Sequence, residues 1–162
     1  MFISSNFDSG NIEVISCEVF DDGVGKIQLH IRKDAHSEFF QWFHFRLSGA
    51  RGVRCTLKIL NAGAAAYPPG FADYRVCYSY DRDSWLRHTT KLEQGVLSFD
   101  FKPDCDSVYF AYFAPYSMER HHDLIAKSSQ SSLYSHRLLG QSLDGQDLDL
   151  LRIGLPDQNE NK

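Results

Sequence analysis

The segment 26–32 reads Lys-Ile-Gln-Leu-His-Ile-Arg, and it decides the fold class. Its residues alternate strictly, so that Ile27, Leu29 and Ile31 share one face while the other face carries only polar side chains. A period of two indicates a β-strand with one buried and one solvated face, which is typical of antiparallel sheets. This segment therefore predicts an antiparallel β protein.

The same alternation recurs along the first 114 residues. The further strand candidates are residues 12–17, 39–47, 53–60, 74–80, 85–87, 95–101 and 107–114. Turn-forming residues separate them, such as Asp21-Asp22-Gly23 and Asp81-Arg82-Asp83-Ser84, and the loop that opens at Asn61 contains Pro68-Pro69. About eight strands without a helical period predict an antiparallel β-sandwich over residues 1–114.

The composition agrees with this interpretation and limits the partners. The 162 residues are 43% hydrophobic and 23% charged, and the aromatic share of 14% favours β structure, with Trp42 expected as a buried anchor. A net charge of −4 gives no basic surplus, so we expect no nucleic-acid partner. Neither a secretory signal nor an apolar run of about 18 residues occurs, so we expect no membrane segment. The four cysteines, Cys17, Cys55, Cys77 and Cys105, are then expected to be reduced core thiols of a cytoplasmic protein.

The pattern changes at Pro115. Ser117 is a suitable N-cap for an amphipathic helix over 118–127. Residues 137–143 and 147–153 are strand candidates joined through Asp144-Gly145, which predicts a hairpin with a type I′ turn. A hairpin alone is marginally stable, so we interpret residues 115–162 as an incomplete part that lacks its packing partner.

The residues themselves predict no catalytic centre. None of the seven histidines has the spacing of a zinc motif, and His121-His122 would point about 100° apart on a helix. The histidines are therefore expected to be solvated or to face a partner. Nucleophile elbows and phosphate loops are missing as well, and the paired aspartates fall at turns. Tyr67 and Phe71 are candidates for an exposed sugar-stacking platform.

Several segments resemble the N-terminal part of the cytosolic carboxypeptidases, a branch of the zinc metallocarboxypeptidases. They occur in the family's order and are residues 7–11 (Phe-Asp-Ser-Gly-Asn), 41–46 (Gln-Trp-Phe-His-Phe-Arg), 61–63 with 67–68, 79–82 with 85–87, and 110–117. Residues 140–148 resemble the hairpin that opens metallocarboxypeptidase catalytic domains, with Gln146 in the usual place of an arginine. In that family a β-sandwich precedes the α/β catalytic domain and packs against it, so the resemblance implies that residues 115–162 are the incomplete start of that α/β domain.

The resemblance implies a parent enzyme that binds zinc and removes C-terminal residues, often acidic ones such as glutamate, from peptides or proteins. The family's H-x-x-E, distal His, substrate-gripping Arg and general-base Glu have no counterpart here. We therefore assign this chain no catalytic, cofactor-binding or metal residue, and expect it to be inactive alone. Its expected partners are the C-terminal carboxypeptidase domain and the parent's substrate.

Four residues are candidates for a domain interface or cleft, namely Tyr116, Arg120, His121 and His122. Two alternatives remain open: a free-standing β-sandwich module that binds a carbohydrate or a protein partner, and an enzyme with an unrecognised site. The helix and hairpin after Pro115 favour the carboxypeptidase interpretation, because a self-contained module has no use for them.

Overall fold

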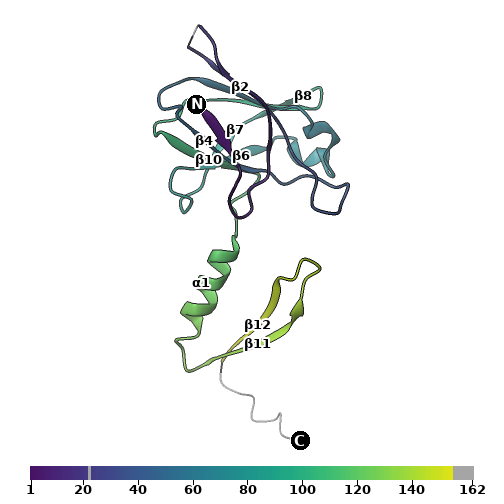
Figure 1. Cartoon of the computed structure of the whole chain (residues 1–162), viewed down its shortest axis with the longest axis vertical. Helices are drawn as coiled ribbons and strands as arrows, with labels where there is room; N and C mark the ends of the chain where they lie inside the picture. The colour runs from purple at the N-terminus through teal and green to yellow at the C-terminus, as the bar shows by residue number, and fades with distance from the viewer. Residues whose placement is uncertain (22, 155–162) are drawn as a thin grey trace, which may run out of the picture. The chain divides into compact units, whose positions relative to one another are not determined.

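The computed structural model describes residues 1–21 and 23–154, so Asp22, predicted to lie in a turn, and residues 155–162 are outside the described residues. The chain divides into two compact units, Met1–Pro115 and Tyr116–Lys162 (Figure 1).

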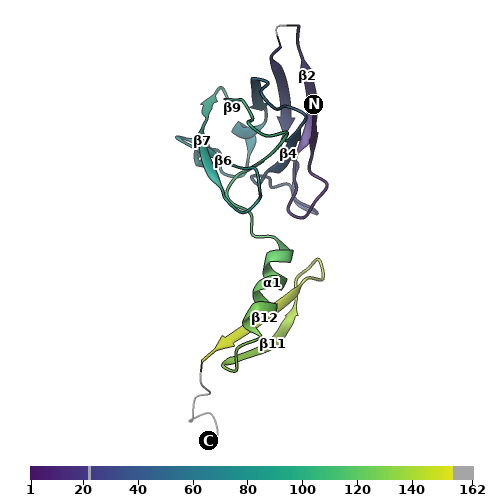
Figure 2. The ribbon, with the colours of Figure 1, turned by 90° about the vertical axis from the view of Figure 1, so that its left-hand side faces the viewer.

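The first unit contains two five-stranded sheets, which together confirm the predicted β-sandwich. The first sheet has the spatial order β1 (Phe2–Ser4), β4 (His44–Ser48), β10 (Ser107–Ala111), β6 (Arg75–Ser79) and β7 (Leu86–Thr89). The second has the order β2 (Glu13–Val19), β3 (Gly25–His30), β5 (Cys55–Ile59), β9 (Val96–Phe101) and β8 (Lys91–Glu93). β2 is an edge strand and lies at the outside of the unit in both views (Figures 1 and 2).

The observed strands differ from the predicted ones in their pairing, their number and their boundaries. β3 and β5 pair in parallel, because the chain between them crosses to the other sheet through β4. β1 and β8 have three residues each, too few for a visible alternation. The strand predicted over 39–47 begins only at His44, since the carbonyls of Phe39 and Phe40 accept loop hydrogen bonds from Asp34 and Ala66. The loop at Asn61 contains two short 3-10 helices, η1 (Ala62–Ala64) and η2 (Pro68–Phe71).

Aromatic side chains join the two sheets. Phe110 of one sheet contacts Phe99 and Phe101 of the other, with ring centroids 5.3 and 5.1 Å apart. The ring of Phe45 lies 5.4 Å from that of Phe110, tilted by 33°, and is fully buried. The prediction that Trp42 is a buried anchor is wrong: its side chain is half-buried, and its indole N–H donates to the carbonyl of Ser9.

Two other burial predictions need correction. Phe71 is buried in the core, so it cannot share an exposed platform with Tyr67. The cysteines are all free, but only Cys55 and Cys77 are buried, whereas Cys17 is half-buried and Cys105 is exposed. Burial raises the pKa of the Cys55 thiol to about 11.

The second unit consists of one helix and one hairpin, α1 (Met118–Ser128), β11 (Tyr134–Gln141) and β12 (Asp147–Ile153). The predicted N-cap is confirmed, because the Ser117 hydroxyl accepts a hydrogen bond from the backbone N–H of Arg120 at 3.3 Å. The predicted type I′ turn is wrong. The N–H of Gly145 donates to the Ser142 carbonyl, and of the turn residues only Gly145 has a positive φ, whereas type I′ needs it at both central residues.

This unit buries little of its apolar surface. No residue of α1 is buried. The exposed large apolar side chains of the unit are Tyr116, Leu124, Leu133, Leu138, Leu139, Leu143, Leu148, Leu150 and Ile153. Within residues 1–21 and 23–154, no helix is long and apolar enough to cross a membrane.

Candidate domain-interface site

The four interface candidates lie at the beginning of the second unit and differ in solvent exposure. Tyr116 is 59% exposed, and Arg120 and His122 are also exposed, whereas His121 is half-buried. The ring of His121 lies 6.2 Å from that of Tyr116 and 6.1 Å from that of His122. The structure therefore places the rings of Tyr116 and His122 beside His121 and leaves Arg120 on the exposed surface of the helix.

Asp149 of the hairpin forms a hydrogen bond with the helix. Its carboxylate accepts hydrogen bonds from Nε2 of His121 at 2.7 Å and from Nε2 of His136 at 2.6 Å. Its side chain is only 8% exposed, and the two imidazole donors hold its pKa below the usual range. The sequence carried no local signal for this cluster, because its members come from three different elements.

This cluster does not fit a zinc ion. Zinc is held by about three or four ligands whose lone pairs converge on the metal. Here both Nε2 atoms donate to different oxygens of one carboxylate. No group of three or more His, Cys, Asp or Glu residues in the described part of the chain is arranged to hold a metal ion.

A second cluster forms in the first unit, where the segments that carry the family resemblance meet around His44. The imidazole of His44 has the rings of Phe7, Trp42 and Trp85 at 4.9, 6.1 and 5.8 Å, and its Nδ1 lies 3.0 Å from Oγ of Ser9. His44 is 1% exposed, so the expectation of solvated or partner-facing histidines is wrong for this residue. The local sequence did not reveal this, because loops far apart in the chain supply the cover.

The hydrogen bonds of His44 exclude a role in activating Ser9. The Ser9 hydroxyl donates to the carbonyl of Asp8, so Nδ1–H of His44 donates to Ser9 Oγ rather than removing its proton. Burial, together with the positive charge of Arg82, lowers the pKa of His44 to about 4, against the opposing effect of Asp8. The imidazole is therefore neutral at pH 7 and serves the packing of these segments.

The same family segments also form an exposed surface, which we call the aromatic surface (Trp42, Tyr67 and Phe113). The rings of Trp42 and Phe113 are 4.8 Å apart, and Phe113 and Tyr67 are more than half exposed. Gln41 joins Tyr67 to Tyr112, since its Nε2 donates to the hydroxyl of Tyr112 and its Oε1 accepts from the backbone N–H of Tyr67. The ring of Tyr112 lies 5.6 Å from that of Phe113. Solvent-exposed aromatic side chains of this kind are typical of interfaces.

Comparison with known families agrees with the fold and with these segments. Residues 3–113 match the family described as the cytosolic carboxypeptidase N-terminal domain. The chain belongs to this family. A protein of Zymomonas mobilis, described as uncharacterized, is 45% identical over 152 residues, which are 94% of this chain and 39% of that protein.

Solved structures of carboxypeptidases are similar to this chain over the residues of both units. A putative carboxypeptidase A from Shewanella denitrificans is 47% identical with a TM-score of 0.88, and covers 97% of this chain. The metallo-carboxypeptidase of Burkholderia cenocepacia is 41% identical with a TM-score of 0.90, and covers 99%. A Pseudomonas aeruginosa metallo-carboxypeptidase, in complex with (2-guanidinoethylmercapto)succinic acid, is 38% identical with a TM-score of 0.87, and covers 97%. This chain spans about two-fifths of the length of each.

Proposed function

We propose that this chain acts as the N-terminal, non-catalytic part of a longer zinc metallocarboxypeptidase. In this proposal residues 1–114 form an accessory sandwich that packs on the catalytic domain and shapes access to it, and residues 115–162 begin that domain. Family membership, and solved metallo-carboxypeptidases that align with nearly the whole chain but are about 2.5 times longer, support this role.

The observation that carries the proposal is the uncovered apolar surface of the hairpin. Leu148 and Leu150 are 49% and 41% exposed and alternate with Asp149, so they lie on the sheet face opposite the one that meets α1. A two-stranded sheet with exposed apolar side chains gains stability only when further structure covers it. The C-terminal catalytic part of the longer protein supplies this cover, and the aromatic surface of the sandwich faces the same partner.

The reaction proposed for the longer protein is removal of C-terminal acidic residues, glutamate above all, from peptides or proteins in the cytoplasm. Zinc would be bound by the catalytic part, because the described residues of this chain offer no fitting ligand set. A basic C-terminal residue is the second candidate substrate. It is favoured by the guanidino group of the compound bound to the Pseudomonas relative.

A chimera tests the proposal. The 162-residue chain is compared with the same chain joined to the C-terminal part of the Burkholderia cenocepacia metallo-carboxypeptidase, using mass spectrometry for zinc and short peptides ending in Glu or Arg for activity. We expect zinc and peptide cleavage only in the chimera, and its preference for Glu or Arg reports the specificity of the Burkholderia catalytic part. Chelator-sensitive activity in the chain alone would overturn the non-catalytic role, and a preference for Arg would favour the second candidate only as the specificity of a relative.

A matched pair of variants tests the interface within the chimera. Leu150→Gln alters the uncovered face, whereas Leu143→Gln alters the fully exposed tip of the hairpin turn. We expect the first substitution to lower the yield of active chimera and the second to leave it unchanged. Equal yields would contradict the assignment of this face to the catalytic part.

A further inference from the structure

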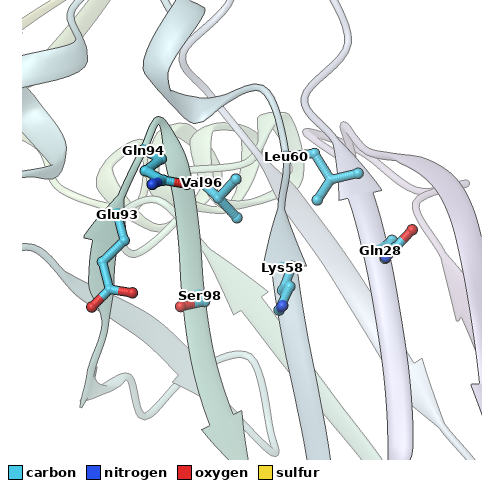
Figure 3. A pocket seen from close by; sticks show the side chains of 7 residues that line it. All are labelled: Gln28, Lys58, Leu60, Glu93, Gln94, Val96 and Ser98. Carbon is cyan, nitrogen blue, oxygen red and sulfur yellow. The ribbon is translucent and has the colours of Figure 1, made fainter.

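We propose that the outer face of the β2-β3-β5-β9-β8 sheet binds a neutral oligosaccharide. A hollow of about 670 Å³ lies on this face and is lined by Gln28, Lys58, Leu60, Glu93, Gln94, Val96 and Ser98 (Figure 3). A neighbouring hollow of about 300 Å³ shares Lys58, Glu93 and Ser98 and extends to Asp100 and Lys91. The larger hollow has a volume in the range of small-molecule sites, and the site is independent of the carboxypeptidase proposal.

The polar side chains of the hollow are available to a ligand. Within the described residues, Gln28, Lys58, Glu93 and Gln94 make no side-chain hydrogen bond or ion pair, in contrast to Thr56, which donates to the Asp100 carboxylate at 2.6 Å. In Figure 3 Lys58 and Ser98 lie between Glu93 and Gln28. Donors and acceptors thus stand side by side over neighbouring strands.

The turn that presents Glu93 and Gln94 is held in place by its own packing. Gln94 and Gly95 have φ values of 49° and 81°, the positive pair of a type I′ turn between β8 and β9. The N–H of Gly63 donates to the Gly95 carbonyl at 2.7 Å, and a Cβ at Gly63 would lie 2.5 Å from Gly95 Cα. The site is therefore preorganised.

The lining selects a neutral, hydroxyl-rich ligand. The charges of Lys58 and Glu93 cancel. An acidic ligand would be repelled by Glu93 and by the neighbouring Asp100, and a basic ligand by Lys58 and the neighbouring Lys91. Sugar hydroxyls both donate and accept, which matches an ammonium, a carboxylate and two amides. Leu60 and Val96, both half-buried, offer aliphatic surface to the C–H face of a sugar ring. Two adjoining hollows fit more than one ring.

Nuclear magnetic resonance titration of the 162-residue chain tests this site. The probes are cellotetraose, maltotetraose and chitotetraose, with tetraglutamate as the charged comparison. We expect at least one saccharide to cause saturable amide shifts at the residues that line the hollow. Replacing Lys58→Ala and Glu93→Ala together should weaken that binding by about tenfold or more, because two hydrogen-bonding groups are lost.

The matched control is the pair Lys26→Ala and Glu13→Ala, which removes the same two charges from β3 and β2 outside the hollow. We expect saccharide binding to survive in this control. The proposal is overturned if none of the three saccharides gives saturable shifts, if the shifts map elsewhere, if the two double variants bind equally, or if tetraglutamate binds the hollow more tightly. Because the titration tests only the outer face of this sheet, these outcomes leave the carboxypeptidase proposal untouched.

Discussion

The strands of both units alternate apolar and polar residues, but the two units bury their apolar side chains to very different degrees. In the sandwich, β3 places Ile27 and Leu29 at 1% exposure or less, whereas in the hairpin Leu148 and Leu150 remain nearly half exposed. Local alternation and turn residues are enough to specify a strand, but burial depends on a second layer. The sandwich contains both of its layers. The hairpin has one face toward α1 and one face uncovered.

The largest expected effect separates the two units directly. Phe45→Ala should lower the free energy of unfolding by about 3–5 kcal/mol, because a fully buried ring leaves a cavity between the sheets. Leu150→Ala should change it by less than about 0.5 kcal/mol, as at an exposed position. Urea unfolding of both variants measures the difference. Equal shifts would break the distinction between a packed and an unpacked unit.

The free energy of unfolding of the sandwich should depend on pH partly because of its buried histidine, His44. His44 has a pKa of about 4 in the folded chain and about 6.5 when unfolded, so the unfolded state binds the proton first as the pH falls. Stability from this residue is therefore present above pH 6.5 and declines toward pH 4, by about 2 kcal/mol between pH 7 and pH 5. His44→Gln should remove this part of the slope in urea titrations. An unchanged slope would show that His44 is solvated.

A smaller effect is expected where two loops of the sandwich touch. Gly63→Ala would place a methyl group 2.5 Å from Gly95 Cα, and overpacking of this kind costs about 1–3 kcal/mol. Gly52→Ala is the comparison, because no atom lies within 4 Å and only its φ of 72° is unfavourable. Thermal unfolding should show a larger loss for Gly63→Ala. The reverse order would mean that the loops are not in contact.

The smallest effect should be confined to the second unit. Ser117→Ala removes the N-cap of α1 and should destabilise that helix by about 1 kcal/mol, whereas Ser117→Asp should retain the cap. Amide hydrogen exchange of α1 measures the change. A matching fall in the protection of the sandwich strands would show that the two units unfold together, contrary to our account.

The sequence predicted what depends on neighbours along the chain and missed what depends on distant ones. Alternation located β3, and Ser117 marked the beginning of α1, because both signals are local. The parallel pairing of β3 with β5 was not visible, since it follows from a crossover between sheets. The burial of His44 likewise depends on distant side chains, among them Phe7, Trp85 and Tyr109.

In the candidate site, too, the sequence indicated individual residues but not the contacts between distant ones. The sequence pointed to Tyr116, His121 and His122, but it did not reveal that His121 shares Asp149 with His136 across three elements. Nor did it reveal the hollow on the outer sheet face, whose lining comes from four strands and a turn. Side-chain clusters of this kind arise from topology, which a local pattern does not encode.

Amide hydrogen exchange, measured in the 162-residue chain and again in the chimera with a catalytic part, shows whether the second unit depends on that part for its core. We predict that the amides of α1, β11 and β12 exchange much faster than those of the sandwich in the chain alone, because few apolar contacts cover them. In the chimera they should become as protected as the sandwich strands. Equally strong protection of both units in the chain alone would contradict the claim that the second unit obtains its core from a catalytic domain.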